Sequence, residues 1–277
     1  MKIFLPTNIK EFLEIKSKEP DAIILAGGTD LLAQWHNNKI MPNKIISISM
    51  LKNLSFIKEE NNFVEIGSLT NHATIESNKI INKYLPILAT AASTIGAPAI
   101  RNMGTIGGNI ANASPAADLA PALLVYDAIV KLTSMNSTRE LKLSEFYRGY
   151  KQTALGKDEL IFSIKIPLPP QGVVTEFFKI GTRRAQSIAK VSLAGLIKKE
   201  KKGIDIIRLA AGSVAPTPIR LYELEKFLQG KILTRSVIST ACDILQKYIK
   251  PITDVRSTEE YRRIALKNIL VKFLSGI

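Results

Sequence analysis

Apolar residues in the first fifty positions predict two strands that flank a glycine turn and a helix. Their helical spacing from Ile9 to Leu13 indicates a first helix, and the apolar run 22–26 indicates a buried strand. Two glycines follow that strand, and the pattern then predicts a helix over 31–37 and a second strand over 44–48. This order places the glycine pair at a helix N-terminus, where backbone N–H groups favour an anion.

The middle of the chain carries short alternating segments separated by alanine-rich helical stretches. The alternating segments predict strands over 54–58, 63–67, 128–133, 139–143 and 160–166. The intervening pattern predicts helices over 86–95 and 118–127.

The segment 167–172 separates two patterns of different character. Its three prolines and one glycine cannot continue a helix or a strand, so we expect a linker here. The elements predicted beyond it are strands over about 173–180, 188–199 and 204–214 and helices over about 219–229, 234–248 and 257–274. Strands followed by helices predict an α+β domain over 171–277, after a first domain over 1–170.

Two glycine-rich turns about 80 residues apart carry the strongest chemical signal. They are Ala26-Gly27-Gly28-Thr29-Asp30-Leu31 and Gly104-Thr105-Ile106-Gly107-Gly108-Asn109. Glycine has no Cβ, so backbone N–H groups can approach an anion closely. Two such turns can grip a diphosphate from both sides, which suggests a bound dinucleotide. Each turn taken alone is also consistent with an ordinary tight turn.

The second turn continues into a polar run among small residues. Thr105, Asn109, Asn112, Ser114 and Asp118 lie in a segment made largely of glycine, alanine and isoleucine. These side chains supply hydrogen bonds to a ligand, or they serve as caps of a Gly/Ala loop, with Asp118 capping the next helix. Neither turn has the Gly-x-Gly-x-x-Gly or Walker A spacing, which argues against an ordinary NAD-binding fold and a P-loop enzyme.

The inventory of metal ligands and nucleophiles is small. Cys242 is the single cysteine, whereas an iron–sulfur cluster needs about four thiolates. His36 and His72 are too few for a metal site of the usual kind. We therefore expect no protein-bound metal and no catalytic side chain.

The net charge of +14 allows two interpretations. It reflects lysines spread over solvated faces, or a basic surface for nucleic acid or an acidic partner. No basic stretch is interleaved with aromatic residues, so we favour solvated faces. No apolar run reaches the roughly 18 residues that span a bilayer. The first residues indicate a strand rather than a signal peptide, so we expect a cytoplasmic protein.

Three ordered motifs are shared with a known family. They are Ala26–Leu31, then Thr105–Asn109 with Ser114-Pro115-Ala116-Ala117-Asp118, and finally the segments 177–191 and 212–218. Together they resemble the FAD-binding medium subunit of molybdenum hydroxylases, the family of carbon monoxide dehydrogenase, xanthine dehydrogenase and related aldehyde dehydrogenases. The resemblance covers nearly the whole chain.

The resemblance implies a FAD-binding fold of the vanillyl-alcohol-oxidase (PCMH) type. This fold has two α/β subdomains, about 1–52 and 53–170, followed by a C-terminal α+β domain with a three-stranded antiparallel sheet and helices. The implied FAD is non-covalent, with its diphosphate between the two turns. Ser114 and Asp118 would lie towards the adenosine and ribose end, and the Lys179 ammonium near the flavin. The implied cofactor-binding residues are Ile24, Leu25, Ala26, Gly27, Gly28, Thr29, Asp30, Leu31, Ile95, Gly96, Gly104, Thr105, Ile106, Gly107, Gly108, Asn109, Ala111, Asn112, Ser114, Asp118, Leu160 and Lys179.

The resemblance also implies partners. The chain would be the FAD-carrying electron-transfer subunit of a heterotrimeric molybdenum hydroxylase, in a dimer of heterotrimers. A large subunit would hold molybdopterin, and a small subunit would hold two [2Fe-2S] clusters that pass electrons to FAD and on to a soluble acceptor such as NAD. Two alternatives stay open. One is a free-standing FAD-dependent oxidase or dehydrogenase of the same fold, and the other is a non-enzymatic basic nucleic-acid-binding module.

Overall fold

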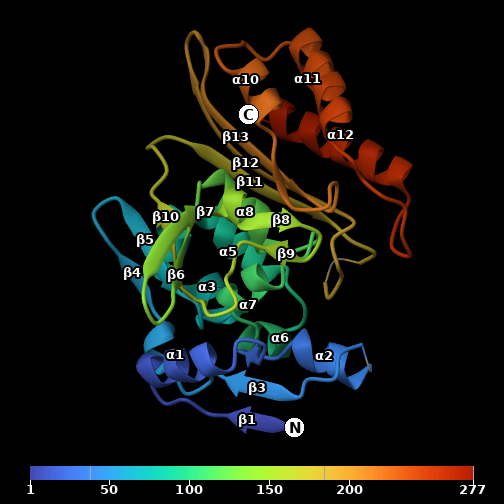
Figure 1. The fold of residues 1–277 in the computed structure, drawn as a ribbon. Coiled ribbons are helices and arrows are strands. Elements are labelled where there is room, and N and C mark those ends of the chain that lie inside the picture. Colours follow the sequence, from blue (N-terminus) through green and yellow to red (C-terminus); the bar gives the residue numbers. More distant parts are fainter. Residues whose placement is uncertain (38, 184, 277) are drawn as a thin grey trace.

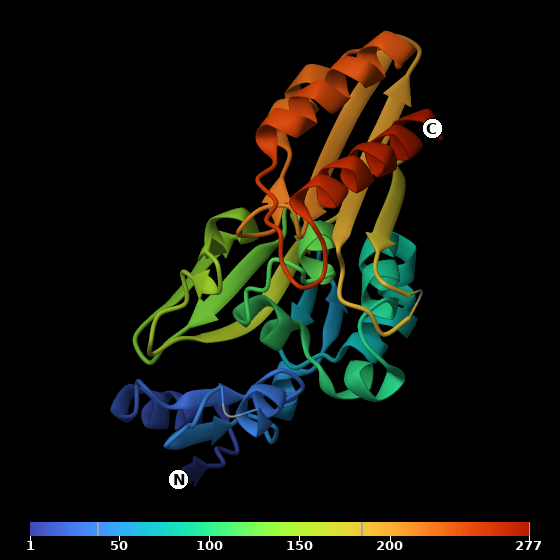
Figure 2. The same cartoon turned by 90° about the vertical axis from the view of Figure 1, so that its right-hand side faces the viewer.

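Three bodies follow one another along the chain in a computed structural model of the protein (Figure 1), which describes residues 1–37, 39–183 and 185–276. The N-terminal body and the C-terminal helices lie at opposite ends, and the middle of the chain lies between them in both views (Figures 1 and 2). Arg184, within the third motif, lies outside the described residues. No helix in the described ranges is both long and apolar enough to cross a membrane.

The N-terminal body is a three-stranded parallel sheet in the order β1-β3-β2, with helices in its connections. Asn8 begins the first helix, because its side chain accepts the Glu11 N–H at 3.0 Å. The elements are β1 (Lys2–Phe4), α1 (Ile9–Lys18), β2 (Ile23–Leu25), α2 (Leu31–His36), β3 (Lys44–Ser47) and the 3-10 helix η1 (Lys52–Leu54). The predicted strand–turn–helix–strand unit is present as β2, the first glycine turn, α2 and β3.

The middle body is a five-stranded antiparallel sheet in the order β4-β5-β10-β6-β7, packed against a group of short helices. Its strands are β4 (Ile57–Glu59), β5 (Phe63–Gly67), β6 (Ile129–Thr133), β7 (Thr138–Lys142) and β10 (Leu160–Pro167), with a separate ribbon of β8 (Tyr147–Gly149) and β9 (Gln152–Thr153). Its helices are α3 (His72–Ser77), α4 (Lys79–Tyr84), α5 (Pro86–Ser93), α6 (Pro98–Met103), α7 (Ile106–Ala111), α8 (Leu119–Val125) and α9 (Leu143–Phe146). The second glycine turn joins α6 to α7.

The C-terminal body is a four-stranded antiparallel sheet in the order β11-β12-β13-β14, covered on one side by three helices (Figure 2). Its elements are β11 (Val174–Ile180), β12 (Val191–Glu200), β13 (Gly203–Gly212), β14 (Ile219–Arg220), α10 (Tyr222–Leu228), α11 (Arg235–Tyr248) and α12 (Glu259–Ser275). The three long strands match the prediction. The expected three-stranded sheet is corrected to four, because β14 pairs with the end of β13 through only two residues, too few for an alternating pattern.

Helix α8 joins the middle body to the C-terminal sheet, and all seven of its residues are buried. Arg208 and Arg220 on the C-terminal sheet donate to its last carbonyl oxygens at 3.3 and 2.9 Å. Arg220 also pairs with Asp127 just beyond the helix, at 2.5 Å. Cations are favourable at a helix C-terminus, so these contacts fix the C-terminal body on α8.

Candidate functional site

The two glycine turns touch each other. The backbone of Gly27 approaches the chain after α6 so closely that a Cβ there would lie 1.8 Å from the Met103 carbonyl oxygen and 3.2 Å from Gly104 Cα. Gly28 adopts a φ of +72°, in the left-handed region that favours glycine. The two glycine motifs, which are distant in sequence, are therefore packed directly against each other.

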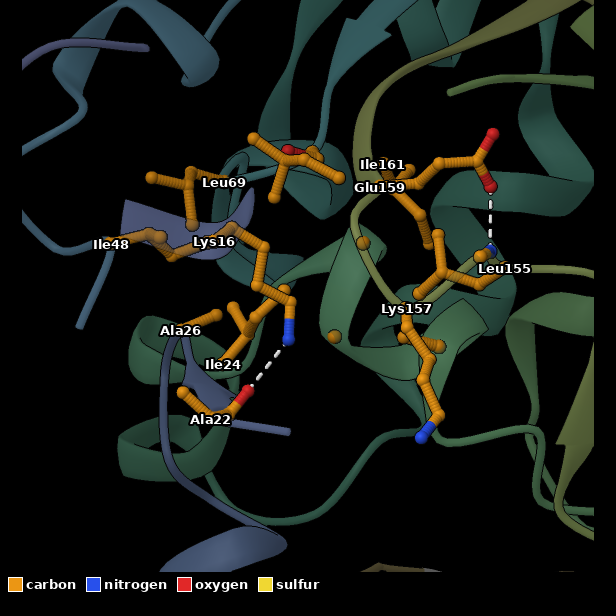
Figure 3. Close-up of a pocket in the computed structure, with 16 residues that line it drawn as sticks. Lys16, Ala22, Ile24, Ala26, Ile48, Leu69, Leu155, Lys157, Glu159 and Ile161 are labelled. Carbon is orange, nitrogen blue, oxygen red and sulfur yellow. Dashed lines mark hydrogen bonds between the residues drawn. The ribbon is translucent and has the colours of Figure 1, made fainter. Parts of the chain in front are cut away.

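A cavity of about 250 Å³ opens beside the joined turns, between the N-terminal and middle bodies (Figure 3). One wall is formed along β2 by Ala22, Ile24 and Ala26, and the other by Leu155 and the start of β10. The lining is mainly apolar. Six of the predicted cofactor residues line it together: Ile24, Ala26, Gly107, Gly108, Ala111 and Leu160.

The two turns differ in what their backbones offer. Within the described part of the chain, the N–H groups of Gly28, Thr29 and Asp30 donate to no acceptor. In the second turn, by contrast, the N–H groups of residues 106–109 all donate inside the protein, to Thr70 O, Ser68 O, Thr105 Oγ1 and Thr105 O respectively, at 2.9–3.1 Å. The N–H groups of residues 106–109 are therefore not free for an anion, whereas that of Thr105 has no acceptor among the described residues. Gly108 also allows close approach, because a Cβ there would meet only Thr105 Oγ1, at 3.0 Å.

Three buried oxygens near these elements have no hydrogen-bond partner among the described residues. They are Ser68 Oγ, Asn109 Oδ1 and Asp118 Oδ1. Buried polar atoms are nearly always paired, so each of these oxygens can take a hydrogen bond from a ligand group or a water molecule. Sequence reasoning identified Asn109 and Asp118 but missed Ser68, which lines the cavity after β5, because a single serine at a strand end carries no recognisable signal.

Asp118 and Lys179 form a buried ion pair between α8 and β11. Lys179 Nζ lies 2.5 Å from Asp118 Oδ2 and 2.8 Å from the Thr94 carbonyl oxygen, and both charged side chains are less than a tenth exposed. Burial raises the pKa of Asp118 to about 6, although the adjacent ammonium lowers it. Asp118 and Lys179, which the resemblance implied at the ribose end and near the flavin respectively, are thus in direct contact.

Arg101 holds the backbone next to this ion pair. Its guanidinium donates to the carbonyl oxygens of Ile95 and Gly96, at 3.3 Å each, and to Glu76 at 2.8 Å. Gly96 has a φ of +48°, and a Cβ there would meet Ile100 at 2.8 Å. The segment 94–96 is thus fixed by Arg101 and, through Thr94, by Lys179.

The predicted residues fall into two groups. The first group lies along the cavity and the joined turns, and the second comprises Ile95, Gly96, Asp118 and Lys179, none of which lines the cavity. Asp30 is engaged by Gln34, and Ser114 Oγ accepts the Ala116 N–H at 3.3 Å. The remaining predicted positions lie in β2, in the second turn and at the ends of α2 and α7: Leu25, Leu31, Gly104, Ile106 and Asn112.

The imidazole of His72 packs against the second turn at Gly104. It is 3 % exposed, and a Cβ on Gly104 would lie 3.0 Å from its ring. Burial, with a smaller contribution from Arg101, lowers the pKa of His72 to about 4. The imidazole packed against the turn is therefore neutral at physiological pH.

This burial predicts an acid-sensitive contribution to stability. The pKa of His72 is about 4 in the folded chain against 6.5 in the unfolded chain, so the unfolded state binds the extra proton between those values. The contribution is complete above pH 6.5 and is lost as the pH falls to 4, by about 3 kcal/mol. We expect denaturant titrations from pH 7 to 4 to show this loss in the wild type and not in His72→Gln. The exposed-site variant His36→Gln is the control and keeps the wild-type slope; parallel curves for wild type and His72→Gln would contradict the prediction.

Comparison with known proteins identifies the family. The family model described as the FAD binding domain in molybdopterin dehydrogenase matches residues 1–169, and the CO dehydrogenase flavoprotein C-terminal domain matches residues 176–277. The chain is 34 % identical to the glyceraldehyde dehydrogenase medium chain of Sulfolobus acidocaldarius, over 96 % of this chain and 94 % of that one. It is 30 % identical to the xanthine dehydrogenase FAD-binding subunit of Escherichia coli, over 96 % and 92 %.

The fold agrees with these matches. A solved structure of carbon monoxide dehydrogenase from Hydrogenophaga pseudoflava superposes with a TM-score of 0.94 at 28 % identity, covering 98 % of this chain and 95 % of that one. Both family models, the relatives and the superposition point to the same group of proteins. The chain therefore belongs to the family of FAD-binding medium subunits of molybdenum hydroxylases.

Proposed function

We propose that the joined turns hold the diphosphate of FAD, with its adenosine half in the cavity and its flavin beside Asp118 and Lys179. The contact of Gly27 with Met103 carries this proposal, because it brings three unpartnered N–H groups next to a cavity of mainly apolar lining. Gly28, Thr29 and Asp30 would donate to phosphate oxygens, and Gly108 would let the ligand approach the second turn.

The unpartnered oxygens fit the polar parts of the same ligand. Asn109 Oδ1 and Asp118 Oδ1 would accept hydrogen bonds from hydroxyl groups of the ligand. The Ser68 hydroxyl would form a hydrogen bond with a polar group of the ligand in the cavity. Bound FAD supplies a carrier that takes up electrons singly and releases them as a pair. The Lys179 ammonium, fixed by Asp118 and Thr94, would stabilise negative charge on a reduced ring.

Electron transfer, rather than catalysis on a substrate, accounts for the side chains around the cavity. The ionisable groups that line it are Lys16, Lys157 and Glu159, and each has a partner in the protein. Lys16 donates to the carbonyl oxygens of Pro20 and Ala22. Lys157 pairs with Asp21, and Glu159 pairs with Arg139. We infer that the chain passes electrons from iron–sulfur clusters of a small partner subunit, through FAD, to an external acceptor such as NAD. A large molybdopterin subunit would complete a dimer of heterotrimers in the cytoplasm. Relatives named as medium chains of carbon monoxide and glyceraldehyde dehydrogenases support this inference.

The glycine pairs give a direct test of FAD binding. We expect Gly28→Val and Gly108→Val each to weaken FAD binding by roughly 100-fold or more. A Cβ at Gly28 would lie 2.9 Å from Leu32 Cδ1 and so displace the turn with its donors, whereas a side chain at Gly108 would fill space next to the proposed diphosphate. The measurement is the ratio of flavin absorbance to protein after purification, followed by titration with FAD. Gly172→Val is the matched control for Gly28, because Gly172 has a φ of +77° against +72° but nothing within 4 Å of its Cβ. Full flavin occupancy in both site variants would exclude the proposed position of the diphosphate.

The subunit role is tested by identifying the proteins that co-purify with the chain. We expect the natively expressed protein to co-purify with a larger molybdopterin-containing chain and a smaller iron–sulfur chain, and the FAD of the complex to be reduced when substrate is added. Size-exclusion chromatography with metal analysis and flavin absorbance measures both. A stable monomer that oxidises a substrate by itself would instead identify a free-standing flavoprotein and contradict the electron-transfer role.

A further inference from the structure

A buried lysine stands in the wall of the cavity. Lys16 lies in the last turn of α1 and is only 5 % exposed, and Figure 3 shows its side chain along the β2 side of the cavity. Its Nζ donates to the carbonyl oxygens of Pro20 and Ala22, at 2.8 and 2.7 Å. These two bonds tie the end of α1 to the start of β2.

The two bonds leave part of the ammonium group unused. An ammonium has three N–H donors, and no third acceptor for Lys16 lies within residues 1–37, 39–183 and 185–276. Burial lowers the pKa of Lys16, which reflects the cost of holding this charge away from water. Lysine is rarely so buried without full pairing, so its remaining donor calls for a partner within the cavity.

The other charged groups at the cavity do not offer a comparable donor or acceptor. Lys157 is 79 % exposed in its side chain, pairs with Asp21 at 2.9 Å, and points away from Lys16 (Figure 3). Both carboxylate oxygens of Glu159 are bonded to Arg139, and one also accepts the Gly156 N–H. Lys16 is therefore, beside the Ser68 hydroxyl, a buried polar group that can recognise a ligand in a mainly apolar cavity.

Lys16 in α1 lies beside the start of β2, and this position indicates which part of a ligand it would contact. Strand β2 connects Ala22, bonded to Lys16, to Ala26 at the first glycine turn, and these four residue steps span about 13 Å. With the diphosphate at the turn, a nucleoside that follows the β2 wall of the cavity would reach Lys16. The side chains of Ile24 and Leu155 on opposite walls suit the faces of a planar base.

We propose that Lys16 determines base specificity, donating its third N–H to a ring nitrogen of adenine. The inference rests on the proposed function, since it assumes that the diphosphate lies at the turns. Adenine carries unprotonated nitrogens at positions 1, 3 and 7, each of which can accept this hydrogen bond. Lys16 is a positioning residue for the nucleotide and takes no part in electron transfer.

The test uses ADP and its 1-deaza, 3-deaza and 7-deaza analogues, titrated into the flavin-free full chain by calorimetry. Each analogue replaces one ring nitrogen by C–H and keeps the diphosphate. In the wild type, one analogue should bind about tenfold more weakly than ADP, as expected for one hydrogen bond to a charged donor. In Lys16→Met, ADP itself should bind about tenfold more weakly, and the difference between ADP and that analogue should disappear. Lys18→Met, at an exposed position two residues along α1, should retain the wild-type pattern.

The outcomes separate this inference from the proposed function. Loss of the two backbone bonds in Lys16→Met changes stability, but it does not by itself remove discrimination between analogues. If the wild type binds FAD and ADP but binds all three analogues equally well, the role of Lys16 is overturned and the proposed function stands. The same holds if Lys16→Met discriminates as the wild type does. If the wild type binds neither FAD nor ADP, both proposals fail.

Discussion

The close approach of Gly27 to the Met103 carbonyl is the constraint on which the site depends. No other residue type fits there, because a Cβ would lie 1.8 Å from that oxygen. The contact sets the N-terminal sheet against the middle body and brings the end of β2 beside α7. The cavity and the unpartnered N–H groups of the first turn follow from this arrangement. In the proposed site the two turns have complementary roles: the first supplies three N–H donors, and Gly108 in the second leaves room for the ligand.

The other end of the site depends on α8. Lys179 reaches Asp118 at its N-terminal end, while Arg208 and Arg220 bind the carbonyl oxygens at its C-terminal end. Removing one partner of a buried ion pair typically costs about 3–5 kcal/mol, because the other charge is left buried and unpaired. In the proposed site, the C-terminal body thus supplies one of the cofactor contacts through Lys179.

The sequence predicted those features that local patterns encode. Strand β2, the first turn and α2 followed from apolar spacing, and the long strands β11 to β13 followed from alternation. The short helices α6 and α7, six residues each, span too few turns for periodicity to appear, and β14 has only two residues. The contact between Asp118 and Lys179 joins residues 61 positions apart. Helical spacing places Lys16 on the apolar face of α1 with Phe12 and Leu13, but its bonds to Pro20 and Ala22 carry no sequence signal. Such features arise from tertiary packing, which a single sequence does not display.

In the proposed site, one cofactor is held by donors of the first turn against the backbone of residues 106–109. Amide hydrogen exchange of the flavin-free chain, with and without saturating FAD, measures whether those donors bind it. Exchange over residues 28–30 should slow by about tenfold or more, because their N–H groups gain acceptors, whereas the N–H groups of residues 106–109 are hydrogen-bonded already and should change little. Unchanged exchange over residues 28–30 at full FAD occupancy would contradict the proposed site.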